Sequence, residues 1–138
     1  MTNDEVAALI TGAFESASEP DLRFAPDDTE QLINHFGNIF PNEFRQMRAM
    51  LPNYHIPGDH LPADEIIHDY KWETENNPNF TTDFIPFYAV GNGDYLCLSR
   101  RAGQSSPVLY VAHDDARVER LHDSFAGYLK DSDWFLRK

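Results

Sequence analysis

Residues 83–115 read DFIPFYAVGNGDYLCLSRRAGQSSPVLYVAHDD, and this stretch predicts three neighbouring β-strands. Two β-rich runs, 84–90 and 95–99, flank the tetrapeptide GNGD at 91–94. Asn-Gly between apolar runs is typical of a hairpin, because both residues tolerate a positive φ angle. The run 107–112 is apolar on both faces, which favours a strand buried within a sheet. We therefore expect an antiparallel hairpin that gains a third strand.

Helical patterns surround these strands on both sides. Apolar residues recur at helical spacing in five segments, and turn or capping residues bound most of them. The order of helices, then strands, then a helix predicts an α+β fold with helices against an antiparallel sheet. No linker or repeat divides the 138 residues, so we expect a single domain over 1–138. The five expected helices cover residues 4–15, 27–37, 44–51, 63–75 and 117–129.

Acidic residues dominate the chain. The formal net charge is −12, and residues 59–94 contribute a net −7 because Lys71 is their only basic residue. Such a field repels nucleic acid and attracts a basic partner. The alternative is that the acidity serves only to keep the protein soluble.

Other features bear on the compartment. The longest uninterrupted apolar run is far shorter than the roughly 20 residues of a membrane-spanning helix. The N-terminal residues show no basic segment ahead of an apolar run. Cys97 is the only cysteine and lies in a predicted strand, which is typical of a small buried side chain in a reducing compartment. We expect a cytoplasmic protein that does not bind a membrane.

Histidines and carboxylates raise the possibility of a metal or acid–base site. His113, Asp114 and Asp115 end the third predicted strand, but adjacent residues do not converge on one ion without further ligands. We favour a structural role, in which an aspartate caps the following turn and His113 is hydrogen-bonded at the edge of the sheet. A second candidate metal cluster comprises His55, His60, Asp64 and His68.

Nucleophilic and nucleotide chemistry find no support in the motifs. Cys97 has no local activating group, no serine stands in a Gly-x-Ser-x-Gly turn, and no phosphate-binding glycine loop is present. We assign no catalytic residue, no cofactor and no metal. Aromatic residues do flank the acidic helix, and aromatics ringed by charge are typical of protein-binding hot spots. For Tyr70 we favour core packing, whereas for Trp72 core packing and partner binding remain equally open.

Several motifs in order resemble those of the SUKH superfamily over about residues 25–130. They comprise Gly37 at a helix end, Phe40-Pro41-x-x-Phe44, Asp83-Phe84-Ile85-Pro86-Phe87, Gly93-Asp94-Tyr95-Leu96-Cys97-Leu98, Pro107-Val108 through His113-Asp114, and Ser124-Phe125-x-x-Tyr128-Leu129. The resemblance implies an α+β domain with a curved antiparallel sheet and flanking helices. It also implies a protein that binds and does not catalyse, with structural duties for Gly93, Asp94, His113 and Asp114.

Bacterial proteins of this kind commonly serve as immunity proteins that neutralise a toxin, often a nuclease, and fungal relatives regulate cell-wall synthesis. A nuclease toxin must be basic to hold phosphates, so an acidic inhibitor gains from electrostatic steering. We expect a cognate basic toxin as the partner, and the sequence indicates no oligomeric state. The alternatives are a regulatory or scaffold module and a metal-dependent hydrolase. The predicted partner-binding residues are Asp64, Glu65, Asp69, Trp72, Glu73 and Glu75.

Overall fold

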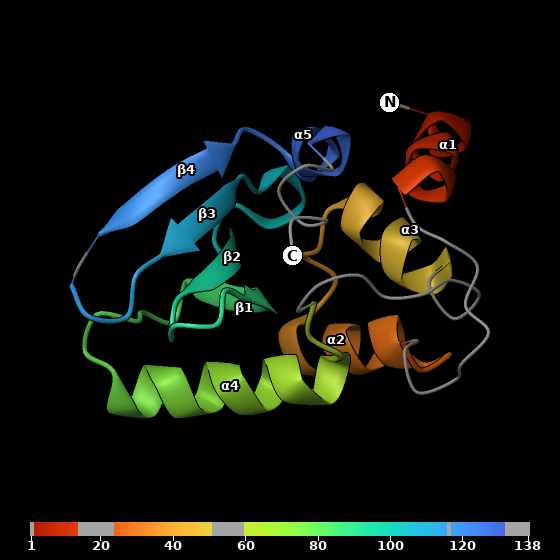
Figure 1. Cartoon of the computed structure of the whole chain (residues 1–138). Helices are drawn as coiled ribbons and strands as arrows, with labels where there is room; N and C mark the ends of the chain where they lie inside the picture. The colour runs from red at the N-terminus through yellow and green to blue at the C-terminus, as the bar shows by residue number, and fades with distance from the viewer. Residues whose placement is uncertain (1, 14–23, 51–59, 116, 132–138) are drawn as a thin grey trace.

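Helices precede a four-stranded sheet, and one further helix follows it (Figure 1). The computed structural model describes residues 2–13, 24–50, 60–115 and 117–131. The predicted α+β class with an antiparallel sheet and flanking helices is confirmed. The elements are α1 (Asn3–Ala13), α2 (Asp28–Phe36), α3 (Asn42–Met50), α4 (Ala63–Asn76), β1 (Phe84–Ala89), β2 (Tyr95–Ser99), the 3-10 turn η3 (Gly103–Ser105), β3 (Val108–Val111), β4 (Val118–His122) and α5 (Phe125–Lys130).

The sheet is an antiparallel meander in the order β1-β2-β3-β4. The predicted hairpin joins β1 to β2, and its turn is closed by a hydrogen bond from the Val90 amide to the Asp94 carbonyl (3.0 Å). Positive φ angles occur at Gly91 (+108°) and Gly93 (+96°), but not at Asn92, which instead accepts a hydrogen bond from the Asp94 amide through its side chain. Two glycines therefore supply the backbone freedom that the turn requires.

The predicted helix over 117–129 is wrong in its first half. Residues Val118–His122 form β4, which pairs with β3 and adds a fourth strand, and only Phe125–Lys130 are helical. Ser124 begins this short helix as an N-cap, because its hydroxyl accepts a hydrogen bond from the Gly127 amide (3.1 Å). The free edge of β3 offers a pairing partner that helical spacing of apolar residues does not reveal.

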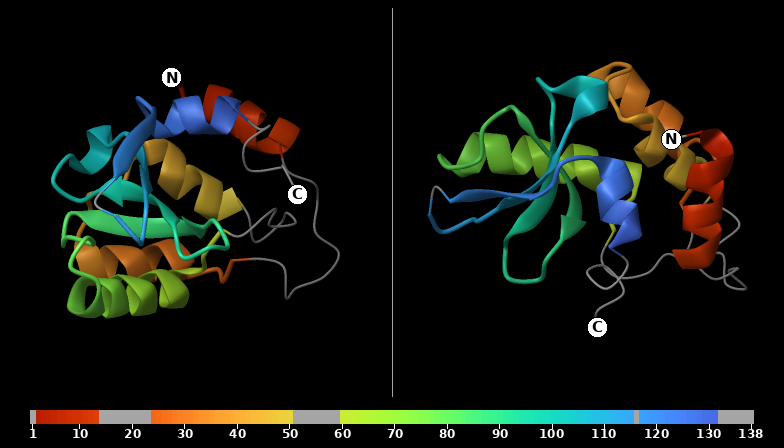
Figure 2. Two further views of the ribbon diagram at one scale, coloured as in Figure 1. Left: turned by 60° about the vertical axis from the view of Figure 1, so that its left-hand side comes forward. Right: turned by 90° about the horizontal axis from the view of Figure 1, so that it is seen from above.

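The helices pack around the sheet in two groups (Figures 1 and 2). α4 contacts β1 and lies beside α2, whereas α1, α3 and α5 contact one another. The main core lies between these helices and one face of the sheet, and its rings include Phe44, Phe87 and Phe125 in edge contacts. On the other face, Phe80 and Cys97 belong to a smaller buried cluster. Both faces of β2 are therefore covered.

A buried ion pair ties α2, α3 and α4 together. Asp28 and Arg48 form a bidentate pair whose side chains are 3% and 0% exposed. Asp28 also accepts a hydrogen bond from the Ala63 amide (2.7 Å), and Arg48 donates one to the Leu61 carbonyl (2.7 Å). Burial lowers the pKa of Arg48, and the hydrogen bond and charge of Asp28 oppose that effect. Asp28 thus satisfies an amide at the start of α4 that has no partner within that helix.

Within the described part of the chain, no helix is both long enough and apolar enough to cross a membrane.

Candidate functional site

The outer side of α4 is polar except for one tryptophan. Ile66 and Tyr70 face the core, so helical geometry turns the residue two positions after Tyr70 to the opposite side. Trp72 lies there with 53% of its surface exposed, and among the described large apolar residues only Val118 is comparably exposed. The sequence left open whether Trp72 packs in the core or lies on the surface, and the structure places it on the surface.

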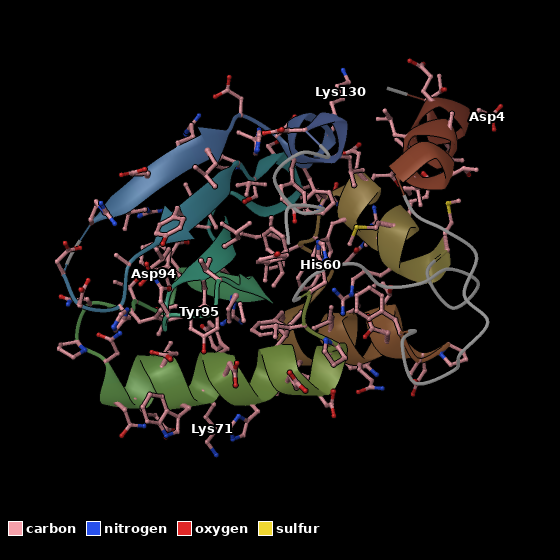
Figure 3. All side chains as sticks on the ribbon, in the orientation of Figure 1. Asp4, His60, Lys71, Asp94, Tyr95 and Lys130 are labelled. Atoms are coloured by element: carbon pink, nitrogen blue, oxygen red, sulfur yellow. The ribbon has the colours of Figure 1, made fainter. Side chains whose placement is uncertain are left out.

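The six predicted partner-binding residues do not share one face. Asp64, Glu65, Trp72 and Glu75 are exposed, whereas Asp69 and Glu73 are only half-exposed. The last two carboxylates turn toward the sheet, where the Tyr95 hydroxyl lies 3.2 Å from an oxygen of each. Figure 3 shows Tyr95 between α4 and the strands, and Lys71 on the side of α4 that faces away from the sheet. The acidic helix therefore has a free outer face and an anchored inner flank.

Tyr95 is a residue that the sequence analysis did not assign to the site. Burial raises the pKa of its phenol, and the charges of Asp69 and Glu73 raise it further. The phenol therefore stays protonated and can always donate to these carboxylates. Tyr95 and Leu96 are neighbours in β2, so their side chains point to opposite faces of the sheet, and Leu96 lies in the main core. This alternation is the sequence signal that could have placed Tyr95 on the other face.

A shallow hollow of about 350 Å³ lies beside Trp72. It brings together the C-terminal half of α4, the turn that follows, the β1–β2 turn and the segment after β3. Two predicted sets of residues meet in it, since Trp72 and Glu73 belong to the partner-binding set and Gly93 and His113 to the motif set. Its lining consists of Trp72, Glu73, Asn76, Asn77, Pro78, Gly93 and His113.

Asp94 organises the sheet side of this hollow. Its Oδ1 accepts hydrogen bonds from the His113 amide (2.8 Å) and from the His113 ring at Nδ1 (2.6 Å), and its Oδ2 accepts one from the Tyr110 hydroxyl. Burial alone would raise the pKa of Asp94, but these hydrogen bonds lower it to about 2. Asp94 raises the pKa of His113 in return, chiefly through the hydrogen bond to the ring. A charged aspartate thus holds the segment after β3 against the β1–β2 turn.

Gly93 provides the space for this arrangement. A Cβ atom at position 93 would lie 3.0 Å from Cγ and Nδ1 of His113, which is tighter than nine in ten Cβ contacts in folded proteins. The positive φ angle of Gly93 also excludes most other residues. Glycine is favoured here for both reasons, and the imidazole ring lies close to its backbone.

Asp94, His113 and Asp114 are the one group in the described residues that places three metal-ligating atoms within 4.8 Å of one another. The Asp94 oxygen nearest the ring already accepts two hydrogen bonds, and metal binding at Nδ1 would remove one of them. Asp114 is exposed. The hydrogen bonds between Asp94 and His113 have a structural explanation, because they join the β1–β2 turn to the segment after β3.

The other candidate metal cluster is dispersed. His60 is buried with its Nε2 2.8 Å from the Tyr128 hydroxyl, whereas His68 is exposed on α4 and contacts Asp69 and not Asp64. His55 lies outside the described residues. The described members of this cluster do not converge on one ion.

Cys97 is fully buried, and burial raises the pKa of its thiol well above the usual range.

A family model described as SMI1 / KNR4 family (SUKH-1) matches residues 24–131. This range agrees with the predicted resemblance over about 25–130. Comparisons with curated proteins and with solved structures returned no match.

Proposed function

This chain belongs to the SMI1 / KNR4 family (SUKH-1), and from that premise we propose that it is a cytoplasmic immunity protein. It would neutralise a cognate basic toxin, a nuclease in the first instance, by forming a stoichiometric complex. Proteins of this family generally do not act as enzymes, which supports a role in binding.

The exposed Trp72 on the acidic helix α4 is the observation that carries the proposal. Trp72 belongs to neither buried cluster of the described residues, and tryptophan is enriched in the residues that dominate binding energy. It stands among the exposed acids Asp64, Glu65 and Glu75. A central aromatic anchor with a charged rim is the usual anatomy of a protein interface.

The charge of this segment supports fast recognition of a basic partner. Residues 59–94 carry a net −7. Complementary fields raise association rates by roughly 10- to 1000-fold at low salt. Speed matters to an inhibitor that must capture its toxin before the toxin reaches nucleic acid.

The test is co-purification with the toxin encoded beside the gene, followed by titration calorimetry. Trp72→Ala should weaken the complex by about 30-fold, because central tryptophans contribute about 2 kcal/mol or more. The double variant Asp64→Lys, Glu65→Lys should lower the affinity and flatten its salt dependence. Glu119→Lys on β4 is the matched control, because Glu119 is exposed but lies outside α4. Failure of any neighbouring toxin to bind the wild-type chain would contradict the proposal.

The second candidate is a regulatory or scaffold module that uses the same surface to bind another cellular protein. Membership of the family supports it, because the resemblance described in the sequence analysis implies regulators as well as immunity proteins. Gene neighbourhood separates the two functions: an adjacent toxin gene favours immunity, and a solitary housekeeping context favours regulation.

A further inference from the structure

We infer that the hollow beside Trp72 is a receptor for one arginine side chain of the partner protein. The inference rests on the proposed binding function and adds the chemistry of the group that is recognised. Three features of the hollow carry it: an aromatic wall, an oriented carboxylate, and a volume suited to a single side chain.

Trp72 supplies the aromatic wall. The residue is 53% exposed and borders the hollow. A guanidinium group stacks on a tryptophan face more favourably than an ammonium does, because it is planar and weakly hydrated.

Glu73 supplies the carboxylate, and the fold holds it in place. Its Oε1 accepts a hydrogen bond from the Asn77 amide group (3.3 Å), and its Oε2 accepts one from the Tyr95 hydroxyl (3.2 Å). Each carboxylate oxygen has a second lone pair, so both remain able to accept from an incoming donor. An oriented carboxylate with two open positions matches the paired N–H groups of arginine.

The surroundings favour a cation over an anion or a neutral group. Among the described residues neither a lysine nor an arginine lines the hollow, and the one basic group in this lining is His113, whose Nδ1 is hydrogen-bonded to Asp94. Asp69 lies one helical turn before Glu73 and shares the Tyr95 hydroxyl with it. Lys71, the nearest lysine in sequence, points away from the sheet (Figure 3).

The volume limits the occupant. About 350 Å³ is at the small end of ligand sites, which commonly span roughly 300–1,000 Å³. A single long side chain fits such a space, whereas a folded segment does not. A basic toxin is rich in arginine at its phosphate-binding surface, so an immunity protein that captures one of these side chains would also mask that surface.

The experiment is a titration of the ¹⁵N-labelled full chain with N-acetyl-arginine amide, followed by NMR. We expect saturable shifts of the Trp72 indole N–H signal and of the Gly93 and Asn77 amides, with affinity in the millimolar range. N-acetyl-citrulline amide has nearly the same shape but no charge, and it should bind at least about tenfold more weakly, since a charge-assisted hydrogen bond contributes that much. N-acetyl-lysine amide should bind more weakly than the arginine probe.

Matched variants assign the binding to this hollow. Glu73→Gln keeps the length of the side chain and one of its two acceptor oxygens but removes the charge, and it should weaken the arginine probe about tenfold. Glu75→Gln removes a charge from the same helix outside the lining and should leave the affinity within about twofold. Trp72→Ala, at an exposed position that folding tolerates, should abolish the shifts at Gly93.

Equal shifts with the arginine and citrulline probes, or an arginine affinity unchanged by both Glu73→Gln and Trp72→Ala, would overturn the inference. These outcomes are independent of the proposed immunity function. If a toxin binds but the arginine probe does not, only the inference of an arginine-binding hollow is refuted. If the arginine probe binds and no toxin does, only the proposed immunity function is refuted.

Discussion

The substitution Asp94→Asn tests the part of the molecule that joins the β1–β2 turn to the end of β3. Asn keeps the shape of the side chain but removes the negative charge and one of the two oxygens that accept hydrogen bonds from Tyr110 and, twice, from His113. Each pKa unit corresponds to about 1.4 kcal/mol, so lowering the pKa of Asp94 from 3.8 to about 2 sets an upper bound of about 2.4 kcal/mol. The hydrogen-bonded edge lies near water, which screens charge, so we expect a loss of about 1–2 kcal/mol at pH 6.

The pH dependence has a defined sign. The pKa of Asp94 is lower in the folded state, so its contribution is present above pH 3.8 and is lost as pH falls toward about 2. The pKa of His113 is higher in the folded state, so its contribution is complete below 6.5 and is lost as pH rises through the folded value. The free-energy difference between wild type and Asp94→Asn should therefore be widest between about pH 4 and 6.5.

Urea unfolding followed by far-UV circular dichroism measures this difference. With a slope of about 2 kcal/mol per molar urea, the midpoint should fall by roughly 0.5–1 M. Asp114→Asn is the control, because Asp114 is exposed beside the same histidine, and it should change the free energy of unfolding by less than about 0.5 kcal/mol. Equal losses in the two variants, or a difference that does not shrink at pH 3, would refute the reasoning.

Three further predictions concern the folded state. Gly93→Ala should lower the free energy of unfolding by about 1–3 kcal/mol, and by more than Gly91→Ala, because both positions have positive φ but only position 93 is crowded; equal thermal melting temperatures would contradict this. Arg48→Met should cost about 3–5 kcal/mol because it leaves Asp28 charged and buried without its partner, and a loss below about 1 kcal/mol in urea unfolding would show that the pair is dispensable. Cys97 should react with a thiol reagent only when urea unfolds the chain, and rapid labelling in native buffer would show that β2 is more accessible than its burial indicates.

Local patterns were sufficient for most of the elements. The hairpin and its three strands were predictable because glycine-rich turns and apolar alternation act over a few residues. The strand Val118–His122 was not, because Val118, Leu121 and Phe125 fit a helical spacing and only pairing with β3 selects the extended form. Whether β3 has a free edge is a property of the assembled sheet.

The candidate site was predictable in composition but not in arrangement. The exposure of Trp72 follows from its position two residues after the buried Tyr70, a relation that helical geometry contains. The inward turn of Asp69 and Glu73 does not, since it depends on how α4 lies against Tyr95 of β2. The helix periodicity specifies which side chains share a face, and tertiary packing specifies what each face meets.

The anchoring of α4 has a consequence for evolution. Its start is held by Asp28 from another helix, and its inner side by Ile66 and Tyr70 in the core. The outward residues take no part in these contacts, so replacing them should change stability by only about 0.5 kcal/mol or less. Under the proposed binding function, outward substitutions can therefore alter partner specificity while these anchoring contacts stay in place. Such a protein would gain from a helix whose inner side maintains the fold and whose outer face can change with the partner.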